Sequence, residues 1–156
     1  MPKYICENCF HAIDWHAIYV EDANIEHRNL TLTFEGLTLT KDHPFNPFHE
    51  DWETNEVIIV LYDVNVLMSG YYDCSAVRKQ VIDFDTDCVF VEVPLLQLLS
   101  NFTIVTEHIH ASEEGVFKQS FEGFAPSFGD DAWGYFELQY TSMRMMWDSF
   151  HNEMNE

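Results

Sequence analysis

The segment from Asn29 to Lys41 constrains the fold more than any other part of the chain. In Leu30–Phe34 every second residue is large and apolar and the others are threonines, and after Glu35-Gly36 the alternation continues through Leu37–Thr40. A period of two is that of a strand with one buried face. We therefore expect a hairpin that turns at Glu35-Gly36 and packs its leucines on a core.

Other apolar or alternating runs predict further strands. The run VIIVLYDVNV is apolar on both faces at its start, which is typical of a central strand. A helical turn is expected at Leu95–Leu99, after Pro94. The expected strands are Val57 to Val66, Val81 to Val93, Phe102 to Ala111, Val116 to Phe124 and Ala132 to Tyr140, the third and fourth forming a second hairpin around residues 112–115.

Two segments show helical spacing. Apolar residues at the C-terminus recur at i, i+3, i+4, i+7 and i+11, which predicts an amphipathic C-terminal helix capped by Thr141 or Ser142. Its stripe either covers the sheet of the same chain or forms a dimer contact, which would make the protein a homo-oligomer. Residues 5–19 have the spacing of a short N-terminal helix, with which a metal knuckle would compete. The C-terminal stripe consists of Met143, Met146, Trp147, Phe150 and Met154.

Strands in succession followed by a helix indicate the α+β class, with a mainly antiparallel β-sheet. The 156 residues contain no repeat and no flexible linker, so we expect a single domain over 1–156. We expect no secretory signal, since the N-terminal residues lack its apolar segment, and the longest apolar run is far shorter than the roughly 20 residues that cross a bilayer. These features predict a cytoplasmic protein whose four cysteines are reduced thiols.

Charge restricts the partners of this chain. It has 27 Asp and Glu against 7 Lys and Arg, a net charge of −20. A nucleic-acid binder without sequence preference needs cations that face phosphate, and an anionic membrane repels such a surface. We therefore expect neither nucleic acid nor membrane as a partner. Nucleophile elbows and glycine-rich phosphate loops are missing from the sequence, which favours a protein without catalytic activity.

Cys6 and Cys9 have the spacing of half a zinc site. His11 and His16 follow closely and would complete it if residues 5–16 fold as a loop. The competing interpretation is two buried thiols that behave as small apolar side chains. We therefore expect no cofactor, with zinc at this half-site as the alternative.

His108 and His110 share one face of a predicted strand, and Glu114 follows. This stretch resembles the His-x-His metal motif of cupins, with Glu114 as the matching carboxylate. The resemblance covers seven residues, and the flanking glycines and the second motif of that family are missing. It implies a metal held by the two histidines, against the alternative that they are surface residues of a hairpin.

Two long connections combine aromatic and acidic residues. They are residues 41–56 and 122–134, and loops of this length are typically functional. Their aromatics either pack on the core or face a ligand. The candidate partner-binding residues are Phe45, Phe48, Glu50, Asp51, Trp52 and Glu53 in the first loop and Phe128, Asp130, Asp131 and Trp133 in the second.

Three interpretations of the acidity remain. It serves to recognise a basic protein partner, it adapts the protein to salt, or it lines a pocket for a small organic cation. In size, charge and β-rich pattern the chain resembles the small acidic immunity proteins that neutralise bacterial toxins. That resemblance implies a non-catalytic inhibitor of a basic protein, which is the function we expect. The alternative is a β domain that binds an organic cation or a metal.

Overall fold

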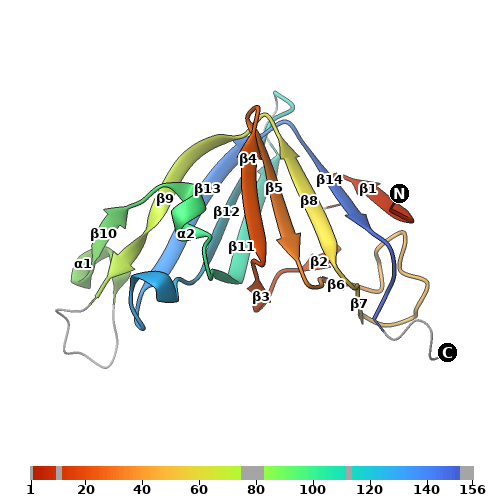
Figure 1. The fold of residues 1–156 in the computed structure, drawn as a ribbon, viewed down its shortest axis with the longest axis horizontal. Coiled ribbons are helices and arrows are strands. Elements are labelled where there is room, and N and C mark those ends of the chain that lie inside the picture. Colours follow the sequence, from red (N-terminus) through yellow and green to blue (C-terminus); the bar gives the residue numbers. More distant parts are fainter. Residues whose placement is uncertain (1, 10–11, 75–82, 112–113, 152–156) are drawn as a thin grey trace.

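The structure is a computed structural model that describes residues 2–9, 12–74, 83–111 and 114–151. Two large antiparallel sheets form the two sides of an arch, and a small third sheet lies below one side (Figure 1). In order across it, the first sheet contains β1 (Tyr4–Glu7), β14 (Ser142–Trp147), β8 (Val57–Tyr62), β5 (Asn29–Phe34) and β4 (Asp22–Glu26). The second contains β10 (Val89–Glu92), β9 (Asn65–Asp73), β13 (Trp133–Tyr140), β12 (Phe117–Phe124), β11 (Thr103–Ala111) and β3 (Ile18–Tyr19). The third contains β2 (Ile13–Asp14), β6 (Thr38–Leu39) and β7 (Trp52–Glu53).

Two strand pairs run through both large sheets and form the crest of the arch. β8 continues into β9, β13 continues into β14, and the two ribbons pair on both sides of the bend. The Thr141 N–H donates to the Tyr62 carbonyl oxygen at 3.0 Å, which keeps the ribbons paired at the bend itself. The two large sheets are therefore continuous with each other at the bend, where they share these two paired ribbons.

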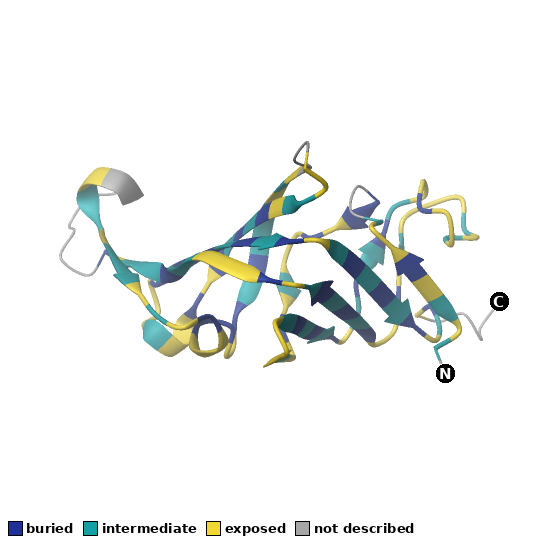
Figure 2. Ribbon diagram, turned by 90° about the horizontal axis from the view of Figure 1, so that it is seen from above, coloured by how far each residue is buried: buried dark blue, intermediate teal, exposed yellow. Residues whose placement is uncertain are grey.

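The core lies on the inner faces of the sheets. Along β8, β13 and β14 buried and partly buried residues alternate strictly, as the banding of the strands in Figure 2 shows. The inner residues join into one contiguous apolar cluster. Its largest fully buried side chains are Trp147, Tyr140, Phe34, Phe102, Phe121, Phe136 and Phe150.

Most of the predicted strands are confirmed. β8 is a central strand between β14 and β5, β11 and β12 form the predicted hairpin, and β13 covers the predicted strand that ends at Tyr140. A helical turn, α2 (Leu95–Leu98), follows Pro94 as expected. A 3₁₀ turn, η1 (Pro126–Phe128), interrupts the loop between β12 and β13.

The α+β class is wrong, because the structure is mostly antiparallel β-sheet and the described part of the predicted C-terminal helix is mainly strand. The predicted helical stripe lies on β14 and just beyond it, and Met154 lies outside the described residues. Positions four apart share a face in both a helix and a strand, so Met143 and Trp147 fit either pattern. Met145 is buried between them, which is possible only with a period of two. Within the described part of the stripe, Met143, Trp147 and Phe150 are buried in the core, whereas Met146 is on the other face of β14 and is only partly buried.

Three local predictions are also wrong. The described part of residues 5–19 contains most of β1 together with β2 and β3, in place of a helix. The expected hairpin at Glu35-Gly36 does not form, because β5 pairs with β4 and β8 while β6 pairs with β2 and β7. Residues Phe84–Asp87 form a helical turn, α1, so the predicted strand begins only at Val89.

The sequence did not predict the pairing of β5 with β4, and the turn between these strands explains why. β4 and β5 join through His27 and Arg28, which both have positive φ angles, of 52° and 67°. Two-residue turns of this kind normally use Asn and Gly, so the sequence contains no recognisable signal for the turn. Within the described residues, no helix has both the length and the apolar character needed to span a membrane.

The close packing of β11 and β12 at Gly123 provides a test of this fold. A Cβ there would overlap the Thr103 carbonyl oxygen on β11. We expect Gly123→Ala to lower the free energy of unfolding by about 3 kcal/mol, measured by urea denaturation. The control is Gly115→Asn, since Gly115 has a φ of 76° that Asn tolerates and no atom within 4 Å of its added Cβ. Equal stabilities of the two variants would contradict the pairing of β11 with β12.

Candidate functional site

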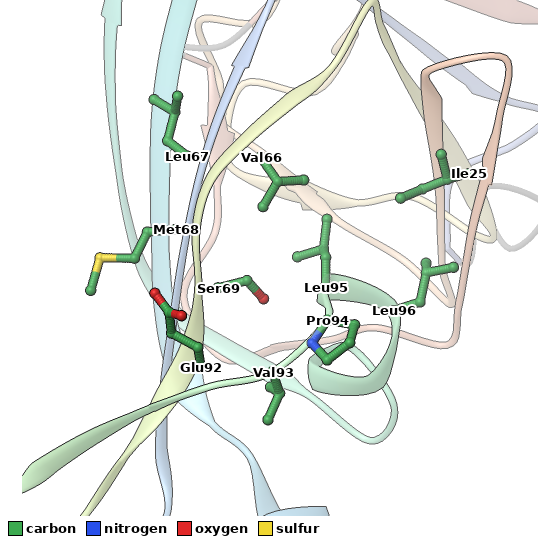
Figure 3. A pocket seen from close by; sticks show the side chains of 10 residues that line it. All are labelled: Ile25, Val66, Leu67, Met68, Ser69, Glu92, Val93, Pro94, Leu95 and Leu96. Carbon is green, nitrogen blue, oxygen red and sulfur yellow. The ribbon is translucent and has the colours of Figure 1, made fainter.

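An apolar hollow of about 510 Å³ opens between β4, β9 and α2. Figure 3 shows Ile25 and Val66 facing each other across it, with Leu95 and Leu96 of α2 below them. Large apolar side chains at its rim are unusually accessible, with exposed fractions between 39% and 43%. These rim residues are Ile25, Val66, Leu67 and Leu96. Exposed aliphatic residues gathered around one hollow are typical of an interaction site.

The hollow exists because the β4–β5 turn is fixed to the bend of the arch. The Val64 N–H donates to the Arg28 carbonyl oxygen at 2.7 Å, and the Asp63 N–H donates to the Asn29 side chain at 3.1 Å. Arg28 and Asp63 also form an exposed ion pair at 3.4 Å. These contacts hold Ile25, which lies near the end of β4, opposite the start of β9.

Strand edges border the hollow on two sides. β4 is the edge strand of its sheet, since it pairs only with β5. The pairing of β10 with β9 covers only Gly70 to Asp73, so the earlier part of β9 extends beyond it. On β9 the Ser69 carbonyl oxygen accepts the Val93 N–H at 3.1 Å, whereas the outer edge of β4 has no ladder partner among the described residues and is available to an added strand.

Acidic residues flank the apolar surface. Glu92 lines the hollow itself. A second hollow of about 270 Å³ shares Leu96 with it and contains Glu21 and Asp22, at the start of β4. Together the two hollows, which we call the β4 groove, combine exposed aliphatic side chains with carboxylates along one strand edge. Sequence reasoning missed this groove, because no local pattern shows that the chain brings β4, β9 and α2 together.

Most aromatics of the two predicted binding loops pack on the protein. Phe48 stacks on Trp52 at 4.2 Å, and the Trp52 indole N–H donates to the His151 carbonyl oxygen at 2.7 Å. Phe128 stacks on Tyr71, and Trp133 meets Phe124 edge to face. Among the predicted aromatics, Phe45 is the exposed one.

The acids of both loops are exposed, but the loops are far apart. Glu50, Asp51, Glu53, Asp130 and Asp131 all face solvent. In Figure 1 the loop over residues 41–56 lies beside β7 near the C-terminus, whereas η1 lies at the other end of the long axis. The structure therefore does not join the two loops into one continuous surface.

A small hollow of about 130 Å³ lies next to Phe128, Asp130 and Asp131. Ligand sites usually measure about 300–1,000 Å³. Tyr71 and Phe128 stack on each other at 4.8 Å, so these two ring faces are already occupied. This geometry suits an organic cation less well than the β4 groove suits a protein segment.

One group of possible metal ligands is present in the described part of the chain. Donor atoms of Cys6, Cys9 and His43 all lie within 4.8 Å of one another. The two sulfurs are in disulfide contact, as are those of Cys74 and Cys88, so the expectation of four free thiols is not met. His43 comes from the loop over residues 41–56, and its spacing from the cysteines follows no motif that sequence reasoning could use.

Local structure holds these three residues in place. Asn8, between the cysteines, has a φ of 55°, and its backbone N–H and side-chain oxygen both bond to Met143 on β14. His43 is only 2% exposed. Its Nδ1 accepts the Phe45 N–H at 3.0 Å, and its ring meets Trp147 edge to face at 5.8 Å.

The other predicted metal ligands do not join this group. His16 is exposed, and its Nδ1 lies 3.2 Å from the Val105 carbonyl oxygen. His108 and His110 are exposed on β11, and no third donor gathers with them among the described residues. His11 lies outside the described residues.

The clearest pKa shifts belong to hydrogen-bonded pairs on the second sheet. Burial, helped by a hydrogen bond to Glu137 at 2.8 Å, raises the pKa of Tyr135 to about 12. Burial opposes ionisation of Glu137, but hydrogen bonds from Tyr135 and Lys118 outweigh it and lower the pKa of that carboxyl. Burial, with the charge of Glu107, also raises the pKa of Tyr140 strongly. These shifts follow from structural contacts of the sheet.

Comparison of the chain with protein-family models, with curated proteins and with solved structures finds no match of any kind. The candidate sites therefore stand on their geometry and chemistry.

The shift of Tyr135 predicts a loss of stability at high pH. In the unfolded chain this phenol loses its proton near pH 10.0, whereas the folded protein keeps it until about 12. The contribution of Tyr135 to the free energy of unfolding is therefore fully present below pH 10 and is lost between pH 10 and 12. We expect the free energy of unfolding, measured by urea denaturation, to decline over this interval, and to decline less steeply in Tyr135→Phe. The two slopes should differ by less than about 1.4 kcal/mol per pH unit, because the ring is partly exposed. Identical slopes for the two proteins would refute the assignment.

Proposed function

We propose that this protein is a non-catalytic binding protein whose partner is a basic protein, bound at the β4 groove. The observation that carries the proposal is the coincidence of exposed aliphatic residues, flanking carboxylates and an unpaired strand edge at one place. An extended segment with apolar residues and Lys or Arg would match all three. Its backbone would pair with the edge of β4, and its apolar side chains would contact Ile25 and Leu96.

Charge supports a basic partner over others. With 27 acidic and 7 basic residues, most carboxylates cannot find a cation within the chain. Asp22 and Glu26 on the edge strand repel a second copy of this chain and any acidic segment, which is how natural edge strands avoid self-association. The same charges attract a basic segment and speed its encounter.

The outline resemblance to acidic immunity proteins agrees with this proposal, and we extend it to a cytoplasmic location and an inhibitory role. The exposed acids of residues 41–56 are a second candidate contact with the partner. If the acidity only adapts the protein to salt, substitutions in the groove should not affect binding. Variants of the groove therefore distinguish salt adaptation from recognition of a basic partner.

The test is capture of partners from a cell lysate with purified protein, followed by binding measurements on the captured partner. We expect a basic protein to bind the wild type and Ile25→Ser/Leu96→Ser to weaken its affinity at least about tenfold, through lost apolar contact. Val89→Ser is the matched control, since Val89 is 68% exposed and lies outside the groove.

A pair of charge variants locates the electrostatic contact. Glu21→Gln/Asp22→Asn removes two charges at the groove and should slow association and reduce its salt dependence. Glu50→Gln/Glu56→Gln removes the same charge from the loop over residues 41–56. Loss of binding only in the loop variant would overturn the groove as the site. Capture of the same proteins by all variants, or of no basic protein, would overturn the proposal.

A further inference from the structure

The group formed by Cys6, Cys9 and His43 is chemically separate from the groove. It joins Cys6 on β1 and Cys9 just after β1 to His43 in the loop over residues 41–56, which is distant in sequence. Sulfur and imidazole donors of this kind suit zinc, which prefers thiolate and histidine ligands. We propose that these three side chains bind a divalent zinc ion when the cysteines are reduced.

The spacing of the donors agrees with this ligand. In a tetrahedral site with Zn–S near 2.3 Å and Zn–N near 2.0 Å, neighbouring donor atoms lie roughly 3.5–3.8 Å apart. The three donors here lie within 4.8 Å of one another, and the two sulfurs, which are in disulfide contact, must move apart on reduction to reach that spacing. Three protein ligands leave the fourth zinc position to another donor, such as water.

The backbone already holds both halves of the site. Asn8 fixes the turn between the cysteines to β14 through two bonds, at 3.0 and 2.8 Å. The side-chain amide of Asn46 donates to the Glu50 carbonyl oxygen within the other loop and to those of Leu39 and Thr40 just before it. Such fixed segments lower the entropy lost when a metal binds.

Proton balance makes the site sensitive to redox state and pH. Reduction of the Cys6–Cys9 bond by a water-soluble phosphine consumes one water and yields two thiols and a phosphine oxide. Zinc binding then releases both thiol protons to solvent. On the imidazole, Nδ1 accepts the Phe45 N–H, so the neutral ring carries its proton on Nε2. Zinc at Nδ1 would replace the Phe45 contact, and zinc at Nε2 would move the ring proton to Nδ1 and break the same contact, so the ring itself releases no proton.

The experiment titrates phosphine-reduced protein with Co²⁺ and then with Zn²⁺. We expect one equivalent of Co²⁺ to give the visible bands of a tetrahedral ion and a thiolate-to-cobalt charge-transfer band, and one equivalent of Zn²⁺ to abolish both. Competition with a chromogenic chelator gives the zinc affinity. Cys6→Ser/Cys9→Ser and His43→Ala should each weaken it at least about 100-fold.

Matched controls remove other cysteines and histidines. Cys74→Ser/Cys88→Ser and His108→Ala/His110→Ala should bind zinc as the wild type does, and oxidised wild type should bind far more weakly. Circular dichroism of each variant confirms that it is folded. The proposal is overturned if the reduced wild type binds no stoichiometric zinc. This outcome does not depend on whether any variant folds. It is also overturned if folded His43→Ala keeps the wild-type affinity or if the oxidised protein binds equally well.

Discussion

The pairing of two bent ribbons supports the rest of this structure. β8–β9 and β13–β14 stay paired through the bend, so the two large sheets share the same two continuous stretches of chain. The hydrogen bond between Thr141 and Tyr62 maintains the pairing at the point where the direction changes. Because the same ribbons enter both sheets, the inner faces of the sheets are brought together around one apolar cluster.

The β4 groove follows from this arrangement. The β4–β5 turn bonds to the backbone of the bend, which places an edge strand beside the beginning of β9. A bend at a sheet corner separates strands that would otherwise be neighbours, and α2 fills only part of the opening. The remaining space has aliphatic walls, and acidic residues flank it.

The two proposed sites use different chemistry. The groove offers an apolar surface and negative charge to a partner, whereas the cysteine–histidine group offers soft ligands to a metal. They lie on separate elements: β4, β9 and α2 for the groove, and the turn after β1 with the loop over residues 41–56 for the metal. That loop also carries predicted partner-binding acids, and a metal that ties it to β1 would fix where those acids lie.

The sequence by itself determined the strands whose alternation is local and unambiguous. Leu30, Leu32 and Phe34 are buried as their period of two predicts, and β11 and β12 pair around the predicted turn. It also determined the charge, which limits the classes of partner. At Met143 and Trp147 the helical and strand periods coincide, and only the ladder with β1 and β8 selected the strand.

Only the tertiary structure decided which strands pair and which side chains meet. The turn at His27-Arg28 has no sequence signal, so the pairing of β5 with β4 could not be predicted from the sequence. His43 reaches the cysteines from more than thirty positions away, and Ile25 meets Val66 only because a hairpin is fixed to a bend. Local periodicity reports the buried face of a strand, while contacts between distant segments depend on how the whole chain packs.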